Sequence, residues 1–118
     1  LGTLPESFGS LTGVTSLDLG ANQISSLPNS IGNLKQLRSL ELHQNKLTEL
    51  PSTIGQMSQL VTIRASNNLL TKLPAELEQI STLTELNLKG NSTLNKLPSN
   101  FASLSSRVNS LNMVDTGL

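Results

Sequence analysis

The chain has 118 residues, enough for one domain, and its eight basic and eight acidic side chains give it no formal net charge. This balance and an aromatic content of 2% argue against a nucleic-acid-binding protein, which usually carries a basic excess or base-stacking rings. No apolar run approaches the roughly 18 residues of a membrane span, and the absence of cysteine excludes disulfides and thiolate metal sites. We therefore expect neither a nucleic-acid partner nor membrane insertion.

A Leu-Pro pair, followed three residues after the proline by an apolar residue, recurs along the whole chain. The leucines of these pairs are separated by three steps of 23 residues and a last step of 24, at Leu4, Leu27, Leu50, Leu73 and Leu97. Proline fixes φ and has no N–H, so it disfavours a long helix here. We expect each of these segments to return the chain through a helical turn or a short 3₁₀ segment.

The second half of each unit reads Leu-x-Leu-x-x-Asn-x-Leu, as in Leu40, Leu42, Asn45 and Leu47. The alternation sends Leu40 and Leu42 into a core and leaves Glu41 outside, as in a short strand. A single unit cannot bury its own apolar face, so we expect neighbouring units to stack into a parallel sheet. The expected strands are centred near Asp18, Glu41, Arg64, Asn87 and Asn112.

An asparagine column follows the strands, at Asn22, Asn45, Asn68 and Asn91. A side-chain amide offers two donors and an acceptor, so it can satisfy backbone groups that the turn would otherwise bury unpaired. Thr116 takes this place in the last unit, and its hydroxyl can replace only part of that bonding. Asn91-Ser92-Thr93 also fits a glycosylation sequon, but we expect the ladder role instead.

Residues Leu37 through Leu47 match the motif Leu-x-x-Leu-x-Leu-x-x-Asn-x-Leu at every defined position, and the chain resembles the leucine-rich repeat family. The resemblance implies an α/β solenoid, with a curved parallel β-sheet on the concave face and short helical or 3₁₀ turns on the convex side. Residues 1–118 would form one leucine-rich repeat domain of about five repeats. Neither end shows the polar outer face of a terminal repeat, so we expect an uncapped segment of a longer array.

The outward strand positions are expected to form rows across the sheet, because parallel strands place equivalent positions side by side. One row holds Asp18, Glu41, Arg64, Asn87 and Asn112, and the next holds Gly20, His43, Ser66, Lys89 and Val114. Concave solenoid faces are extended binding surfaces. The candidate partner-binding residues across the middle three repeats are Arg38, Glu41, His43, Arg64, Glu85, Asn87 and Lys89.

Catalytic and metal-binding alternatives are weaker. Asp18 and Glu41 are expected about one strand spacing apart, ~4.8 Å, a separation near that of a retaining glycosidase pair. An open sheet provides no cleft to shift the pKa of one carboxyl group, so we expect a solvated acidic patch. His43 is the only histidine, and a zinc site would need further histidine or cysteine ligands. We therefore expect no enzyme, no cofactor, and no catalytic or metal-binding residues.

The leading hypothesis is a protein–protein interaction scaffold that binds a partner through the concave face. The 23-residue step with Leu-Pro-x-x-Ile-Gly-x-Leu resembles the intracellular Ras-group and scribble-like class, which implies a cytoplasmic protein with a small GTPase or signalling protein as partner. One alternative is an extracellular ligand-recognition module of a receptor. Another is a structural spacer within a longer repeat array.

Overall fold

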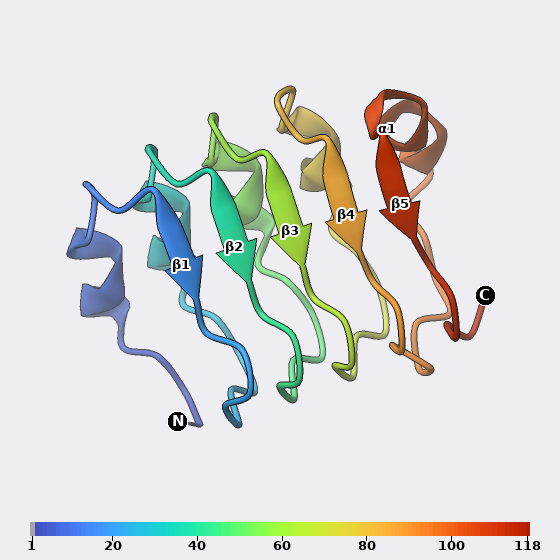
Figure 1. Cartoon of the computed structure of the whole chain (residues 1–118), viewed down its shortest axis with the longest axis horizontal. Helices are drawn as coiled ribbons and strands as arrows, with labels where there is room; N and C mark the ends of the chain where they lie inside the picture. The colour runs from blue at the N-terminus through green and yellow to red at the C-terminus, as the bar shows by residue number, and fades with distance from the viewer. Residues whose placement is uncertain (1) are drawn as a thin grey trace.

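The computed structural model describes residues 2–118. It contains one parallel sheet of five strands, which lie side by side in chain order (Figure 1). The strands are β1 (Ser16–Asp18), β2 (Ser39–Glu41), β3 (Thr62–Arg64), β4 (Glu85–Asn87) and β5 (Ser110–Asn112). The prediction of one parallel strand per unit is confirmed, but each strand is centred one residue earlier than expected. The strands end early because the asparagine side chains bond the carbonyls that follow, such as Leu42 O.

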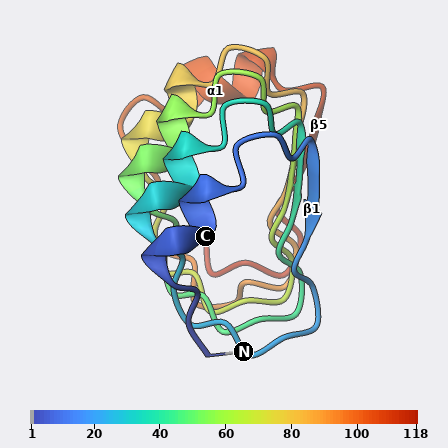
Figure 2. The same ribbon diagram turned by 90° about the vertical axis from the view of Figure 1, so that its left-hand side faces the viewer.

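The returning segments lie on the side of the solenoid opposite the sheet (Figure 2). Four are the expected 3₁₀ turns, η1 (Glu6–Ser10), η2 (Asn29–Asn33), η3 (Ser52–Gln56) and η4 (Ala75–Gln79). Each begins directly after its proline, whose fixed φ suits the start of a helical turn. The Pro28 carbonyl, for example, accepts the N–H of Ile31 at 3.1 Å. The fifth segment has an extra residue and forms an α-helix, α1 (Phe101–Arg107).

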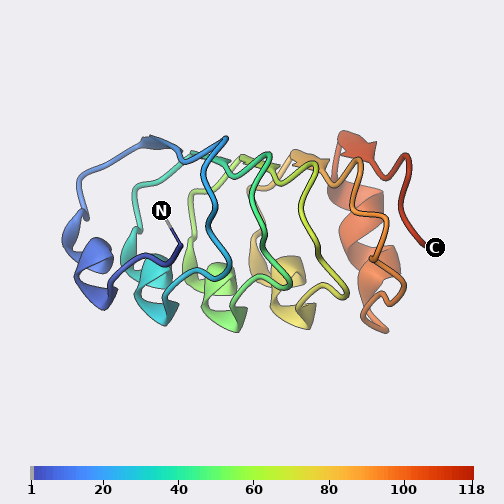
Figure 3. The ribbon, with the colours of Figure 1, turned by 90° about the horizontal axis from the view of Figure 1, so that it is seen from below.

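The core fills the space between these two layers, and the strands follow a shallow arc above it (Figure 3). Leu40 and Leu42 are fully buried from the strand side, as the alternation predicted. Leu34, Leu37 and Leu47 are fully buried from the other sides of the coil. The division into inward and outward columns is therefore confirmed.

Asn45, Asn68 and Asn91 link their repeats to the ones before them, whereas Asn22, within residues 2–118, bonds only Leu19 O and Gly20 O of its own repeat. Nδ2 of Asn68 donates to Leu42 O of the preceding repeat at 2.9 Å and to Ala65 O of its own repeat at 3.1 Å. Its Oδ1 accepts the N–H of Leu47 at 3.0 Å. Asn45 and Asn91 make the equivalent bonds. The predicted ladder is confirmed, and Asn91, 0% exposed, offers no accessible amide as a sequon.

The last unit shows what is lost without the amide. Thr116 Oγ1 donates to Met113 O of its own repeat at 3.0 Å, replacing one of the ladder bonds. Thr116 makes no side-chain bond to the preceding repeat in residues 2–118. The backbone bond from the Gly117 N–H to Leu94 O, at 2.9 Å, remains, and Leu69 makes the same bond to Leu47 O beside Asn68. Threonine thus replaces only part of the asparagine bonding, as expected.

The glycines of the 3₁₀ turns allow neighbouring repeats to approach closely. A Cβ at Gly32 would lie 2.6 Å from the backbone oxygen of Thr53 in the next turn. We expect Gly32→Ala to cost about 1–3 kcal/mol of unfolding free energy, because backbone must move to relieve the contact. In η4 the position of this glycine is occupied by Glu78, so a side chain is tolerated there. Glu78→Ala should therefore change stability by no more than about 0.5 kcal/mol. Equal losses in urea denaturation would contradict this packing role.

Candidate partner-binding surface

The outward face of the sheet, here called the sheet face, carries aligned rows of polar side chains. The strand registers place Glu41 opposite Arg64 and Arg64 opposite Asn87, with Asp18 and Asn112 at the ends of this row. The backbone pairing continues beyond the strands, where the N–H of Ala21 donates to His43 O. The rows predicted from the repeat are therefore present.

Arg64 is at the centre of the sheet face, where it bridges two carboxylates on the neighbouring strands. Its Nε donates to Glu85 Oε2 at 2.8 Å and its Nη2 to Glu85 Oε1 at 3.3 Å, while its Nη1 donates to Glu41 Oε1 at 2.5 Å. The hydrogen bonds to Glu85 and then to Glu41 raise the pKa of Arg64 above its already high value. The Arg64 side chain is 45% exposed, so these pairs contribute at most about 1 kcal/mol of stability. Their main effect is to hold three charged groups in one arrangement.

The other predicted residues lie around this cluster, and their side chains make fewer hydrogen bonds than Arg64 does. Asn87 Oδ1 accepts the N–H of Lys89 at 3.1 Å, and the Lys89 side chain is exposed. Arg38 is exposed just before β2, where it borders a shallow hollow of about 270 Å³ lined by Gln59, Val61 and Thr82. The structure thus brings Glu41, Arg64 and Glu85 into direct contact and places Arg38 beside a hollow that the sequence did not indicate.

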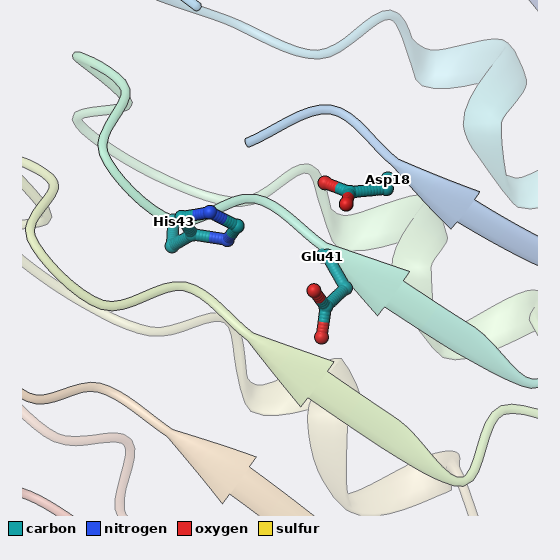
Figure 4. Close-up of side chains that lie close together, drawn as sticks. All are labelled: Asp18, Glu41 and His43. Carbon is teal, nitrogen blue, oxygen red and sulfur yellow. The ribbon is translucent and has the colours of Figure 1, made fainter. Parts of the chain in front are cut away.

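One residue outside the predicted set also belongs to this surface. Asp18, Glu41 and His43 each direct a polar atom to within 4.8 Å of the other two (Figure 4). A Cβ at Gly20 would lie only 2.1 Å from the His43 ring, so glycine makes room for the imidazole. The sequence placed Asp18 beside Glu41 among the charges of this face, but Asp18 was not among the candidate partner-binding residues. The repeat alignment could have indicated this cluster, because it places Asp18 in one row with Glu41 and Gly20 in one row with His43.

A second hollow, of about 500 Å³, lies on the flank of the solenoid, where the chain enters the 3₁₀ turns. Its lining includes Glu49, Lys72 and Glu76. Lys72 Nζ lies 3.9 Å from Glu49 Oε2, and both side chains are about 60% exposed. At this distance and exposure the pair is weak.

The sequence and the fold together define the class of protein. Residues 5–106 match the family described as a leucine-rich repeat region, and the chain belongs to the leucine-rich repeat family. No curated protein sequence matches the chain. In residues 2–118, no helix has the length and hydropathy needed to cross a bilayer.

Several solved structures share the fold. A leucine-rich repeat protein of Leptospira interrogans is 26% identical with a TM-score of 0.78, over 97% of this chain and 34% of that one. The plant peptide hormone receptor RGFR1, in complex with RGF2, is 28% identical with a TM-score of 0.83, over 98% of this chain and 19% of that one.

The ectodomain of the Arabidopsis thaliana membrane receptor kinase GASSHO1/SCHENGEN3, in complex with CASPARIAN STRIP INTEGRITY FACTOR 2, is 30% identical. Its TM-score is 0.81, over 98% of this chain and 14% of that one. The chain therefore spans about a third or less of the length of these structures.

Proposed function

We propose that this chain is a non-catalytic interaction domain that binds a protein partner through the sheet face. The observation that carries the proposal is the Glu41–Arg64–Glu85 cluster, which fixes charged groups from three adjacent strands on an open surface. Groups held in place before binding lose less conformational entropy when a partner docks. Mixed charges in a fixed pattern set the orientation and the association rate of that partner.

The contact has to extend over several repeats. Each strand is three residues long and offers too little surface area for a stable interface, which needs about 800 Å² per partner. The proposed contact set therefore crosses β2, β3 and β4 and the residues beside them, at Arg38, Glu41, His43, Arg64, Glu85, Asn87 and Lys89.

We further propose a small GTPase, or a protein of its signalling pathway, as the partner, and a cytoplasmic location. The support is the 23-residue step with Leu-Pro-x-x-Ile-Gly-x-Leu, which resembles intracellular Ras-group repeats. A second candidate function is peptide recognition outside the cell. Its support is the likeness to two plant receptors solved in complex with RGF2 and CASPARIAN STRIP INTEGRITY FACTOR 2.

The test is a titration of the purified chain against a panel of small GTPases in both nucleotide states. We expect Lys89→Glu and Arg64→Glu to slow association with an acidic partner surface, mainly at low salt, because reversed charges repel it during encounter. Lys89 is the cleaner position, since Arg64 is already paired with two carboxylates. Ser52→Glu and Gln79→Lys, exposed on the 3₁₀ side, are the matched controls and should leave binding unchanged.

The outcomes separate the candidates. Binding that is lost only in the 3₁₀-side variants would show that the sheet face is not the contact surface. A chain that captures extracellular peptides but no GTPase would favour the receptor-type function. Capture of neither would favour a spacer within a longer array.

A further inference from the structure

Asp18, Glu41 and His43 meet on the sheet face at the ends of β1 and β2 (Figure 4). One ligand atom from each lies within 4.8 Å of the other two. The ring nitrogens of His43 face the two carboxylates, which come from adjacent strands in register. Three side chains that are 2 to 25 residues apart in sequence thus share one small space.

Each of the three groups retains bonding capacity toward this space. Asp18 Oδ1 accepts the N–H of Gly20 at 2.9 Å, and Glu41 Oε1 is paired with Arg64. The second oxygen of each carboxylate, and both ring nitrogens of His43, receive no hydrogen bond from residues 2–118. Two carboxylates and an imidazole ring therefore lie together, and Arg64 partly neutralises one of the carboxylates, that of Glu41.

Gly20 makes this arrangement possible. The His43 ring lies where a side chain at position 20 would stand, with Cε1 and Nε2 within 2.1 and 2.3 Å of a Cβ built there. Any other residue would push the imidazole away from Asp18. The backbone of Gly20 has no positive φ, so what requires glycine here is the space beside the ring.

We propose that Asp18, Glu41 and His43 form a surface binding site for Zn²⁺. Zinc accepts mixed nitrogen and oxygen ligands at 2.0–2.2 Å, whereas magnesium and calcium prefer oxygen ligands alone. Ligands at that distance around one ion lie roughly 3.3 Å apart, so ligand atoms that are now within 4.8 Å of one another need to approach by at most about 1.5 Å. Asp18 supplies a carboxylate that only the Gly20 N–H bonds, and Glu41 supplies one whose charge Arg64 partly offsets. A fourth position stays open to water or to a group from a partner.

The experiment is a competition titration of the tag-free, purified chain against a zinc-indicator dye, which uses Zn²⁺ alone as the probe. His43→Ala and Asp18→Asn should each weaken zinc binding by on the order of tenfold or more, because each removes a ligand. Gly20→Ala should also weaken it, although all three ligands remain, because the imidazole is displaced. Glu49→Gln removes the same charge from the distant flank and should leave the affinity unchanged.

A second measurement locates the ion. Adding Zn²⁺ should shift the imidazole ¹⁵N resonances of His43 in the wild type, and thermal unfolding should show that each variant is folded. Absence of zinc binding to the wild type would overturn the proposal. Binding that His43→Ala abolishes but Asp18→Asn and Gly20→Ala leave intact would also overturn it, since that result describes a lone histidine. This test does not depend on whether the sheet face binds a protein.

Discussion

Asn68→Asp is expected to cost about 3–5 kcal/mol of unfolding free energy at pH 7, the cost of an uncompensated buried charge. Asn68 is 4% exposed, and its Nδ2 donates to the carbonyls of Leu42, Ala65 and Ser66. A carboxylate would keep the acceptor for the Leu47 N–H but would turn a second oxygen toward those three carbonyl oxygens. Asn68→Ala should cost less, about 1–3 kcal/mol for each buried group left unpaired.

The loss in Asn68→Asp should depend on pH. Burial and the facing carbonyls favour the protonated carboxyl group, which raises its pKa in the folded chain above the unfolded value of about 3.9. The folded state then binds a proton that the unfolded state releases, so the variant regains stability relative to wild type as the pH falls toward 4. Urea denaturation at pH 7 and pH 4 measures both effects.

Asn67→Asp is the matched control, because Asn67 is the preceding residue and is exposed. Its backbone is left-handed, with φ of 57°, a conformation that asparagine and aspartate both tolerate. The control should stay within about 0.5 kcal/mol of wild type. Equal losses at the two positions would contradict the ladder as the link between repeats.

Leu40→Ala is expected to cost about 2–5 kcal/mol, the range for removing a buried leucine side chain from a packed core. Leu40 is the inward residue of β2 and is fully buried, with a repeat packed on either side. Because repeats are stable only through their neighbours, the loss should also broaden the unfolding transition by weakening the coupling between the two ends of the solenoid.

Ser39→Ala provides the comparison on the opposite face of the same strand. Ser39 is half-buried on the sheet face and should change stability by no more than about 0.5 kcal/mol. Thermal and urea denaturation of both variants give the measurement. A larger effect at Ser39 than at Leu40 would reverse the assignment of inward and outward faces.

The binding surface was only partly predictable. Repeat alignment placed Glu41, Arg64 and Asn87 in one row, because the 23-residue step is constant over those units and parallel strands stay in register. The alignment pairs Arg64 with Asn87 on β4. It could not show that the Arg64 side chain would instead bond Glu85, two residues earlier on that strand. Such contacts depend on side-chain rotamers, which the repeat does not encode.

The sequence by itself determined the repeat length, the inward leucine columns, the asparagine ladder and the start of each 3₁₀ turn. These features are local or strictly periodic, so spacing and residue type specify them. The tertiary structure alone decided that the fifth return forms an α-helix and that His43 meets Asp18 and Glu41. From sequence, a lone histidine without cysteine argued against a metal site. The repeat spacing already placed Asp18 beside Glu41. It could not show that the His43 ring lies over Gly20 and close to both carboxylates, because that depends on the side-chain rotamer.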